Sequence, residues 1–192
     1  MDVVAIFGSP RDPANSTLLA EEVIKAVKSK EGGEVKRFVL NNLKIRGCQG
    51  CNSCKGKTDY CVVKDDLSAV LSASAAADLI VLATPVYMGD VTAQTKIFLD
   101  RTFSWLKPDF HDLEVAGRVG PGRKAFLVFT QGNPDASAYR DRFEAYVQFF
   151  RWLGFKAEGS LATDLNDPAA ALKRPELLAE FKDAALRLVE AK

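Results

Sequence analysis

The sequence predicts a doubly wound α/β fold, in which helices cover both faces of a five-stranded parallel sheet. Short apolar segments alternate with helical patterns along the chain, and two of these segments, residues 79–83 and 125–129, are apolar without alternation. The chain has 192 residues, of which 47% are hydrophobic and 27% charged, and this composition suits one buried core. We therefore expect a single domain over residues 1–192.

The predicted elements alternate in order along the chain. The first strand is the apolar run Val3 to Phe7 at the start of the chain, and a polar Gly-containing loop separates it from the first helix. The strands are expected at residues 2–7, 34–39, 78–84, 124–130 and 156–162. The helices are expected at residues 16–29, 65–75, 92–105, 136–153 and 174–190. Asp65 and Asp66 are placed to cap the second helix.

Charge and histidine content exclude several classes of function. Lys and Arg number 26 against 25 Asp and Glu, without the basic excess typical of proteins that bind nucleic acid. No basic leader precedes the first strand and no apolar run reaches about 18 residues, so we expect a cytoplasmic protein that binds no membrane. With His111 as the one histidine, His-rich zinc sites are excluded and hydrolytic chemistry is disfavoured.

The loop after the first strand offers hydrogen-bond donors at the start of a helix. It lacks the G-x-G-x-x-G of dinucleotide-binding loops and the G-K-[ST] of a Walker A loop. Hydroxyls, one amide and one guanidinium beside a helix N-terminus suit a terminal phosphate monoester, such as that of FMN. The alternative is that Asn15 or Ser16 only caps the helix. The candidate phosphate ligands are Ser9, Arg11, Asn15, Ser16 and Thr17.

Two further turns follow strands at the same edge of the sheet. Pro85 is expected to stop the third strand, and Gly89 permits a turn with positive φ. Tyr87 on this turn can line a planar heterocycle, although it can also pack on the core of a plain strand-to-helix turn. The first of these turns consists of Pro85, Val86, Tyr87, Met88 and Gly89, and the polar turn Thr130, Gln131 and Gly132 follows the fourth strand and alone indicates little.

These three segments occur in an order and at a spacing that resemble a known family. The G-S-P-R…N-S-T loop, the P-V-Y-x-G turn with the following K-I-F-L-D-R, and the T-Q-G turn resemble the NAD(P)H-dependent FMN reductase group of flavodoxin-like proteins, in particular the iron-sulfur flavoproteins. The resemblance spans roughly residues 2–135 and implies a flavodoxin-like fold. It also implies that the first loop holds the FMN phosphate and that the two later turns hold the ring and ribityl chain.

The four cysteines form one local group in the long irregular stretch at about residues 45–64. Cys48, Cys51, Cys54 and Cys61 have the spacing C-x2-C-x2-C-x6-C. Three thiolates in C-x2-C-x2-C can ligate one cuboidal cluster, with the last cysteine as fourth ligand, so we expect a [4Fe–4S] cluster near the flavin ring. A zinc ion, a redox disulfide and free thiols remain alternatives. A phosphatase-type C-x5-R nucleophile is absent.

The expected function is an FMN-dependent oxidoreductase that takes a hydride from NAD(P)H and passes electrons on through the cysteine-ligated [4Fe–4S] cluster. Because the flavin carries the chemistry, we expect no catalytic side chain. The alternatives are an electron carrier that binds no pyridine nucleotide, a redox or metal sensor, and a quinone or azo reductase with vacant cysteines.

Two segments suggest a partner surface. The helix at 136–153 has an aromatic stripe that Phe149 and Trp152 widen beyond one face, and the 106–123 loop is long and rich in glycine. Proteins of the resembled group commonly place the flavin beside a neighbouring subunit. We therefore expect a homodimer or a dimer of dimers, with a redox protein as a further partner.

Overall fold

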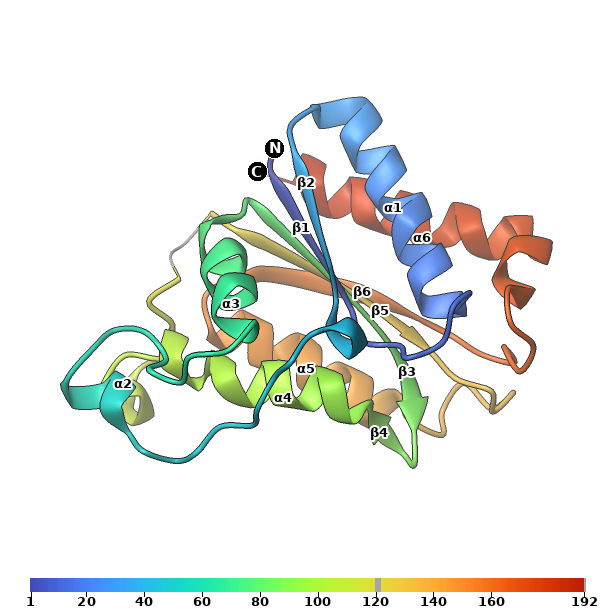
Figure 1. Ribbon diagram of the computed structural model, residues 1–192. Coiled ribbons are helices and arrows are strands. Elements are labelled where there is room, and N and C mark those ends of the chain that lie inside the picture. Colours follow the sequence, from blue (N-terminus) through green and yellow to red (C-terminus); the bar gives the residue numbers. More distant parts are fainter. Residues whose placement is uncertain (120–121, 192) are drawn as a thin grey trace.

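The computed structural model describes residues 1–119 and 122–191, which form a parallel sheet between two layers of helices (Figure 1). The strands are β1 (Val3–Phe7), β2 (Val35–Val39), β3 (Leu79–Tyr87), β4 (Asp90–Val91), β5 (Lys124–Thr130) and β6 (Lys156–Ala162). Five of them pair in parallel in the order β2-β1-β3-β5-β6. The predicted flavodoxin-like fold is confirmed, and the short β4 is added antiparallel to β3.

Helices cover both faces of the sheet. They are α1 (Asn15–Glu31), α2 (Ser53–Gly56), α3 (Leu67–Ala76), α4 (Ala93–Arg101), α5 (Arg140–Trp152) and α6 (Pro175–Glu190). α1 and α6 lie together on one face, and α3, α4 and α5 lie on the other (Figure 1). Along β3, Val81 packs in the core between the sheet and the α1–α6 layer, and the next residue, Leu82, packs in the core on the opposite face. Because both faces are buried, β3 is apolar without alternation.

The expectation that Pro85 stops the third strand is wrong, because β3 continues to Tyr87. Pairing of β3 with β1 ends at Ala83, whose carbonyl accepts a hydrogen bond from the Gly8 N–H. Pro85 lies two residues further on and faces the same side, beyond the end of β1. Its missing N–H therefore removes no bond from the sheet, while β3 still pairs with β5 at this position.

The aromatic excess of α5 is covered within the chain. The Trp152 ring packs edge-on against Phe110 at a centroid distance of 5.8 Å, and its Nε1–H donates to the Leu113 carbonyl. Ala116 N–H donates to the Trp152 carbonyl, so the loop after α4 lies against the end of α5. The second surface expected beside α5 is thus supplied by this loop, of which residues 120 and 121 lie outside the described residues.

The helix expected at residues 92–105 is divided in two. α4 ends at Arg101, and a 3-10 turn, Thr102–Trp105, continues in the same direction. Among the described residues, no helix is both long and apolar enough to cross a membrane.

Candidate functional site

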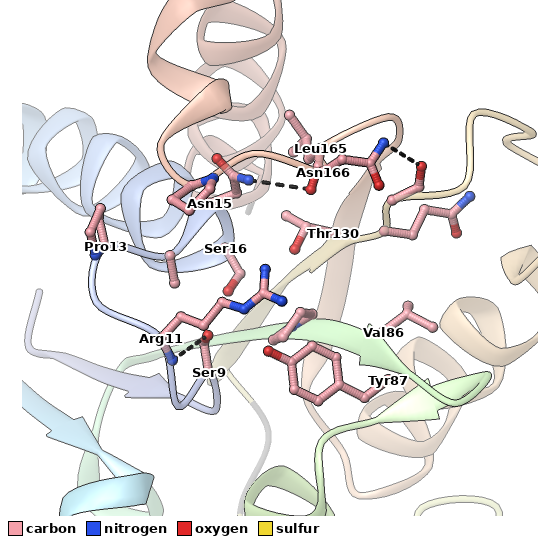
Figure 2. A pocket seen from close by; sticks show the side chains of 15 residues that line it. Ser9, Arg11, Pro13, Asn15, Ser16, Val86, Tyr87, Thr130, Leu165 and Asn166 are labelled. Atoms are coloured by element: carbon pink, nitrogen blue, oxygen red, sulfur yellow. Dashed lines mark hydrogen bonds between the residues drawn. The ribbon is translucent and has the colours of Figure 1, made fainter.

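A pocket opens at the carboxyl edge of the sheet, where the loops after β1, β3, β5 and β6 meet (Figure 2). Ten of the thirteen predicted cofactor-binding residues line it. The lining consists of Ser9, Arg11, Pro13, Ala14, Asn15, Ser16, Pro85, Val86, Tyr87, Thr130, Gln131, Gly132, Leu165, Asn166 and Pro168. Thr17, Met88 and Gly89 are not among the lining residues.

The first turn of α1 presents uncapped donors to this pocket. Ala14 occupies the N-cap position and no side chain caps the helix, so the reading of Asn15 or Ser16 as a simple cap is wrong. Ser16 is 1% exposed and its Oγ has no hydrogen-bond partner among the described residues. Ser9 is also buried and its Oγ accepts from the Arg11 N–H. The Arg11 side chain extends into the pocket beside Ser16 (Figure 2).

The amide of Asn15 is fully occupied by another segment of the chain. Its Nδ2 donates to the carbonyls of Leu165 and Asp167, at 3.4 and 2.9 Å, and its Oδ1 accepts from the Ala171 N–H. Asn15 therefore ties the first turn of α1 to the loop after β6. That loop places Leu165 and Asn166 in the pocket wall.

The end of β3, which leads into the turn to β4, forms one side of the pocket. Met88 and Gly89 both have positive φ, 50° and 83°, as a two-residue hairpin loop of type I′ requires. The expected positive φ at Gly89 is confirmed. Tyr87 points toward the pocket (Figure 2), whereas Met88 is fully exposed at the tip. Burial raises the pKa of Tyr146 behind the turn, and so does the Asp90 carboxylate to which its hydroxyl donates.

The turn after β5 holds an acceptor in a fixed orientation. The Gln131 Nε2 donates to the carbonyls of Asn133 and Asp135, at 3.1 and 2.7 Å. This leaves the Gln131 Oε1 buried without a partner among the described residues. At Gly132, an added Cβ would lie 2.3 Å from the Asn166 Oδ1, so only glycine allows the loop after β6 to approach this closely.

The sequence reasoning missed the wall formed by the loop after β6. We considered the segments after the first, third and fourth strands, although the fifth parallel strand ends at the same edge. Leu165, Asn166 and Pro168 come from this segment. The end of a further parallel strand at this edge was the signal that could have identified them.

A second, smaller cavity is lined by all four cysteines. Cys54 is buried on α2, Cys61 is half-buried, Cys48 and Cys51 are exposed, and all four are free thiols. Hydrogen bonds from the backbone and side chain of Ser53 lower the pKa of the Cys51 thiol. The described residues contain no group of three or more His, Cys, Asp or Glu side chains placed to hold a single metal ion.

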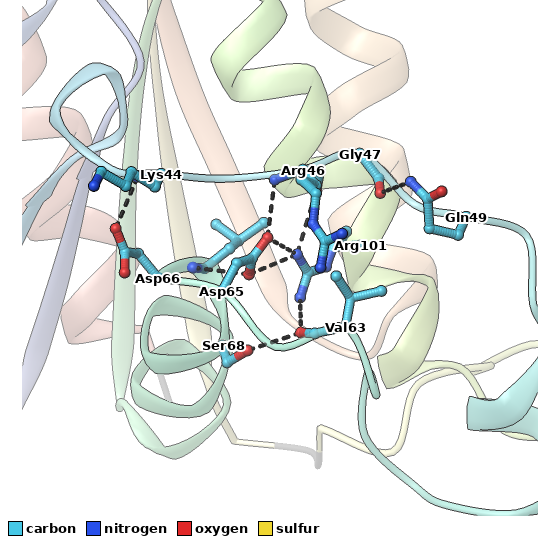
Figure 3. A network of polar contacts seen from close by, with 10 residues as sticks. Lys44, Arg46, Gly47, Gln49, Val63, Asp65, Asp66, Ser68 and Arg101 are labelled. Atoms are coloured by element: carbon cyan, nitrogen blue, oxygen red, sulfur yellow. Dashed lines mark hydrogen bonds and ion pairs between the residues drawn. The ribbon is translucent and has the colours of Figure 1, made fainter.

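A buried ion pair holds the base of the cysteine loop (Figure 3). The Arg101 guanidinium lies 2.7 Å from the Asp65 carboxylate and also donates to the carbonyls of Arg46 and Val63. The same carboxylate accepts from the N–H groups of Arg46 and Leu67. Burial alone raises the pKa of Asp65, but the hydrogen bonds from Arg101 and Arg46 outweigh it, so the pKa lies below its usual range.

The two cavities lie at opposite ends of α4 within one chain. Thr92, at the start of α4, donates through its hydroxyl to the Gly8 carbonyl beside the first pocket. Arg101, at its end, lines the cysteine cavity. The cysteines therefore line one cavity, which shares no lining residue with the pocket at the sheet edge, and their nearness to a flavin ring stays a prediction. The loop runs along α4 away from the carboxyl edge of the sheet (Figure 1).

Comparisons with known proteins identify the family to which the chain is similar. Residues 1–131 match the family described as NADPH-dependent FMN reductase. An iron-sulfur flavoprotein of Methanocaldococcus jannaschii is 40% identical over 102 residues, which are 53% of this chain and 52% of that protein. Another, from Archaeoglobus fulgidus, is 34% identical over 120 residues, or 62% of this chain and 52% of that protein. The chain thus spans about half the length of these curated relatives.

Solved structures share the fold over the whole chain. The NAD(P)H:quinone oxidoreductase from Methanothermobacter marburgensis superposes with a TM-score of 0.73, and the superposition covers 100% of this chain and 98% of that protein's chain. Its sequence identity is 16%, so the likeness concerns the fold alone.

The Asp65–Arg101 ion pair predicts how the free energy of unfolding depends on pH. Because the folded-state pKa of Asp65 is lowered, its contribution is complete above the unfolded-state pKa of about 4 and is lost as the pH falls below it. We expect Asp65→Asn to lower the free energy of unfolding by about 3 kcal/mol at pH 7, and by less at pH 3.5. Urea unfolding at both pH values measures this. Asp66→Asn, at the exposed neighbouring carboxylate, is the control, and an equal loss for Asp65→Asn at both pH values contradicts the assignment.

Proposed function

Because this chain belongs to the NADPH-dependent FMN reductase family, we propose that it is an oxidoreductase that binds FMN in the pocket at the sheet edge. It takes a hydride from NAD(P)H and passes electrons on through a [4Fe–4S] cluster on Cys48, Cys51, Cys54 and Cys61. In this proposal, residues 1–192 are one FMN-binding domain. Bound FMN accepts the hydride and releases its electrons, so no side chain acts as a nucleophile.

The observation that carries the flavin proposal is a pair of buried polar atoms without partners. Ser16 Oγ and Gln131 Oε1 both belong to residues that line the pocket, and an unsatisfied buried polar atom is costly. The Ser16 hydroxyl and the uncapped start of α1 provide donors for a phosphate, and Arg11 adds a positive charge. Gln131 provides an acceptor, which suits a ribityl hydroxyl or a ring N–H.

The remaining predicted ligands have different parts in the proposal. Tyr87 and Val86 at the end of β3 provide the surface for the flavin ring, with Thr130 opposite (Figure 2). Asn15 shapes the wall instead of contacting the phosphate, because its amide already has three partners. For Thr17, Met88 and Gly89, contact with FMN stays a prediction.

The cysteine cavity fits a cluster better than a single ion. A tetrahedral zinc needs four thiolates within about 2.3 Å of one point, whereas each thiolate of a [4Fe–4S] cluster can bind a separate iron. All four cysteines line one cavity, but no three of the described acidic, histidine or cysteine side chains are placed to hold a single ion. This spacing favours a cluster, whose four irons each bind a different thiolate. Cys48 and Cys51 are exposed, so electrons can leave to a protein partner at this surface.

Reduction by pyridine nucleotide separates the proposed enzyme from an electron carrier. We expect anaerobic mixing of the FMN-loaded protein with NADPH or NADH to bleach the flavin absorption with at least one of them, because the hydride passes to the flavin. Stopped-flow absorption measures the rate. If dithionite reduces the flavin but neither nucleotide does, the protein is a carrier.

Substitution of Ser16 tests the phosphate site. We expect Ser16→Glu to abolish FMN binding, because a carboxylate beside a phosphate dianion is repelled in a buried site. Ser16→Ala removes one hydrogen bond and is expected to weaken binding about tenfold. Quenching of FMN fluorescence by apoprotein measures both. Ser16→Gln adds the same bulk without the charge and is expected to bind FMN more tightly than Ser16→Glu, whereas unchanged affinity in Ser16→Glu refutes the placement.

Substitution of Cys51 tests the cluster. We expect anaerobically purified wild-type protein to contain about four iron and four acid-labile sulfide per chain, from the composition of the cluster. Cys51→Ser should lose the broad cluster absorption and keep bound FMN, because the two cavities are separate. Gln49→Ser, an exposed neighbour in the same loop, is expected to keep the cluster. Wild-type protein without iron overturns the cluster and leaves the flavin proposal standing.

We also propose that the chain forms a homodimer or a dimer of dimers whose contacts cover the turn between β3 and β4. Met88 is 104% exposed there, next to Tyr87 in the pocket wall, and an exposed apolar tip beside a binding site suits a subunit contact. We expect light scattering to give at least twice 21.0 kDa at micromolar protein, and Met88→Glu to favour the monomer. A wild-type monomer with flavin bound contradicts this.

A further inference from the structure

Two cationic side chains stand beside the cysteine cavity with only neutral partners. Lys55 follows Cys54 on α2, and its Nζ donates to the carbonyls of Phe103, at 2.5 Å, and Leu106, at 2.9 Å. The ammonium also lies 4.1 Å from the centre of the Phe103 ring, and Phe103 lines the cysteine cavity. Lys55 is half-buried, so its charge is held near the cavity and only partly hydrated.

Arg118 approaches the same loop from the segment after α4. Its Nη2 donates to the Cys54 carbonyl at 3.1 Å, and its backbone N–H donates to the Trp105 carbonyl. Its Nη1 is buried and has no hydrogen-bond partner among the described residues. Buried guanidinium donors normally find an acceptor, and a charged donor without one is costly.

The positive charges of Lys55 and Arg118 have no counter-ion among the described side chains. The ion pairs among the described residues involve neither Lys55 nor Arg118. The third cation at the cavity, Arg101, is neutralised by Asp65. Two partly buried cations close together repel each other unless an anion lies nearby. The surroundings of the cysteines thus carry two positive charges that the described residues do not balance.

We propose that Lys55 and Arg118 form a fixed cationic seat for the cysteine-bound cluster, compensating its negative charge and raising its reduction potential. This inference rests on the proposed cluster. Four thiolates around a [4Fe–4S]²⁺ core have a net charge of −2, which matches the two cations. Reduction adds one electron and brings the charge to −3 without breaking a bond or moving a proton. Because fixed positive charges favour the more negative state, they make the cluster easier to reduce.

The test is a redox titration of the holoprotein followed by the absorption and electron paramagnetic resonance of the cluster. We expect Lys55→Met and Arg118→Gln each to lower the ratio of reduced to oxidised cluster about tenfold at a fixed solution potential. For a one-electron couple this corresponds to a downward shift of about 59 mV. Arg118→Lys keeps the charge and is expected to restore most of the wild-type ratio.

Lys64→Met is the matched control, because Lys64 lies in the same loop but is exposed to solvent, which screens its charge. Equal potentials for wild-type, Lys55→Met and Arg118→Gln proteins, each with four iron per chain, overturn the cationic seat and leave the cluster standing. An equal shift in Lys64→Met overturns it as well, since net charge alone then explains the effect. If Lys55→Met binds no iron, Arg118→Gln decides. A wild-type protein without iron removes the cluster and the seat together.

Discussion

At the carboxyl edge of the sheet, the chain leaves β1 toward α1 on one face and leaves β3 toward β4 and α4 on the other (Figure 1). Neither helix can cover the space between these two departures, because each must pack on its own face. The loops that carry Ser9 and Tyr87 line that space, and the start of α1 points its free N–H groups into it. The pocket is therefore a consequence of the strand order, and side-chain chemistry only decides what it binds.

α4 fixes where the second site lies relative to the first. Its nine residues span about 13 Å, at 1.5 Å per residue. At one end Thr92 is bonded to the Gly8 carbonyl, and at the other Arg101 is clamped by Asp65. Two cofactors placed in these cavities are held apart by a rigid helix.

Most elements were predictable because their signals are local. The apolar runs of β3 and β5 and the periodicity of α5 identify strands and helices without any knowledge of their neighbours. The errors arose where a distant segment decides the outcome. Pro85 is tolerated in β3 because β1 has already ended, and Trp152 is covered by a loop some 40 residues earlier in the chain.

The candidate sites were predictable to the same extent. Cysteine spacing and the loops after β1, β3 and β5 identify residues that line the two cavities. The occupation of the Asn15 amide and the pairing of Arg101 with Asp65 depend on partners far away in sequence. Lys55 and Arg118 also depend on distant partners, because lysine and arginine are common at protein surfaces and only the fold shows that these two lie beside the cysteines.

The amide of Asn15 fastens a segment from the last third of the chain onto the first helix. The family match ends at residue 131, whereas Leu165 and Asn166 stand in the pocket wall. The pocket thus combines a shared part with a part that lies outside the region defining the family. Because the Asn15 amide bonds only backbone atoms of that segment, the side chains of the segment can change while its contact with α1 is kept. The loop after β6 is thus anchored to the first helix through its backbone, and its side chains at Leu165 and Asn166 shape one wall of the pocket.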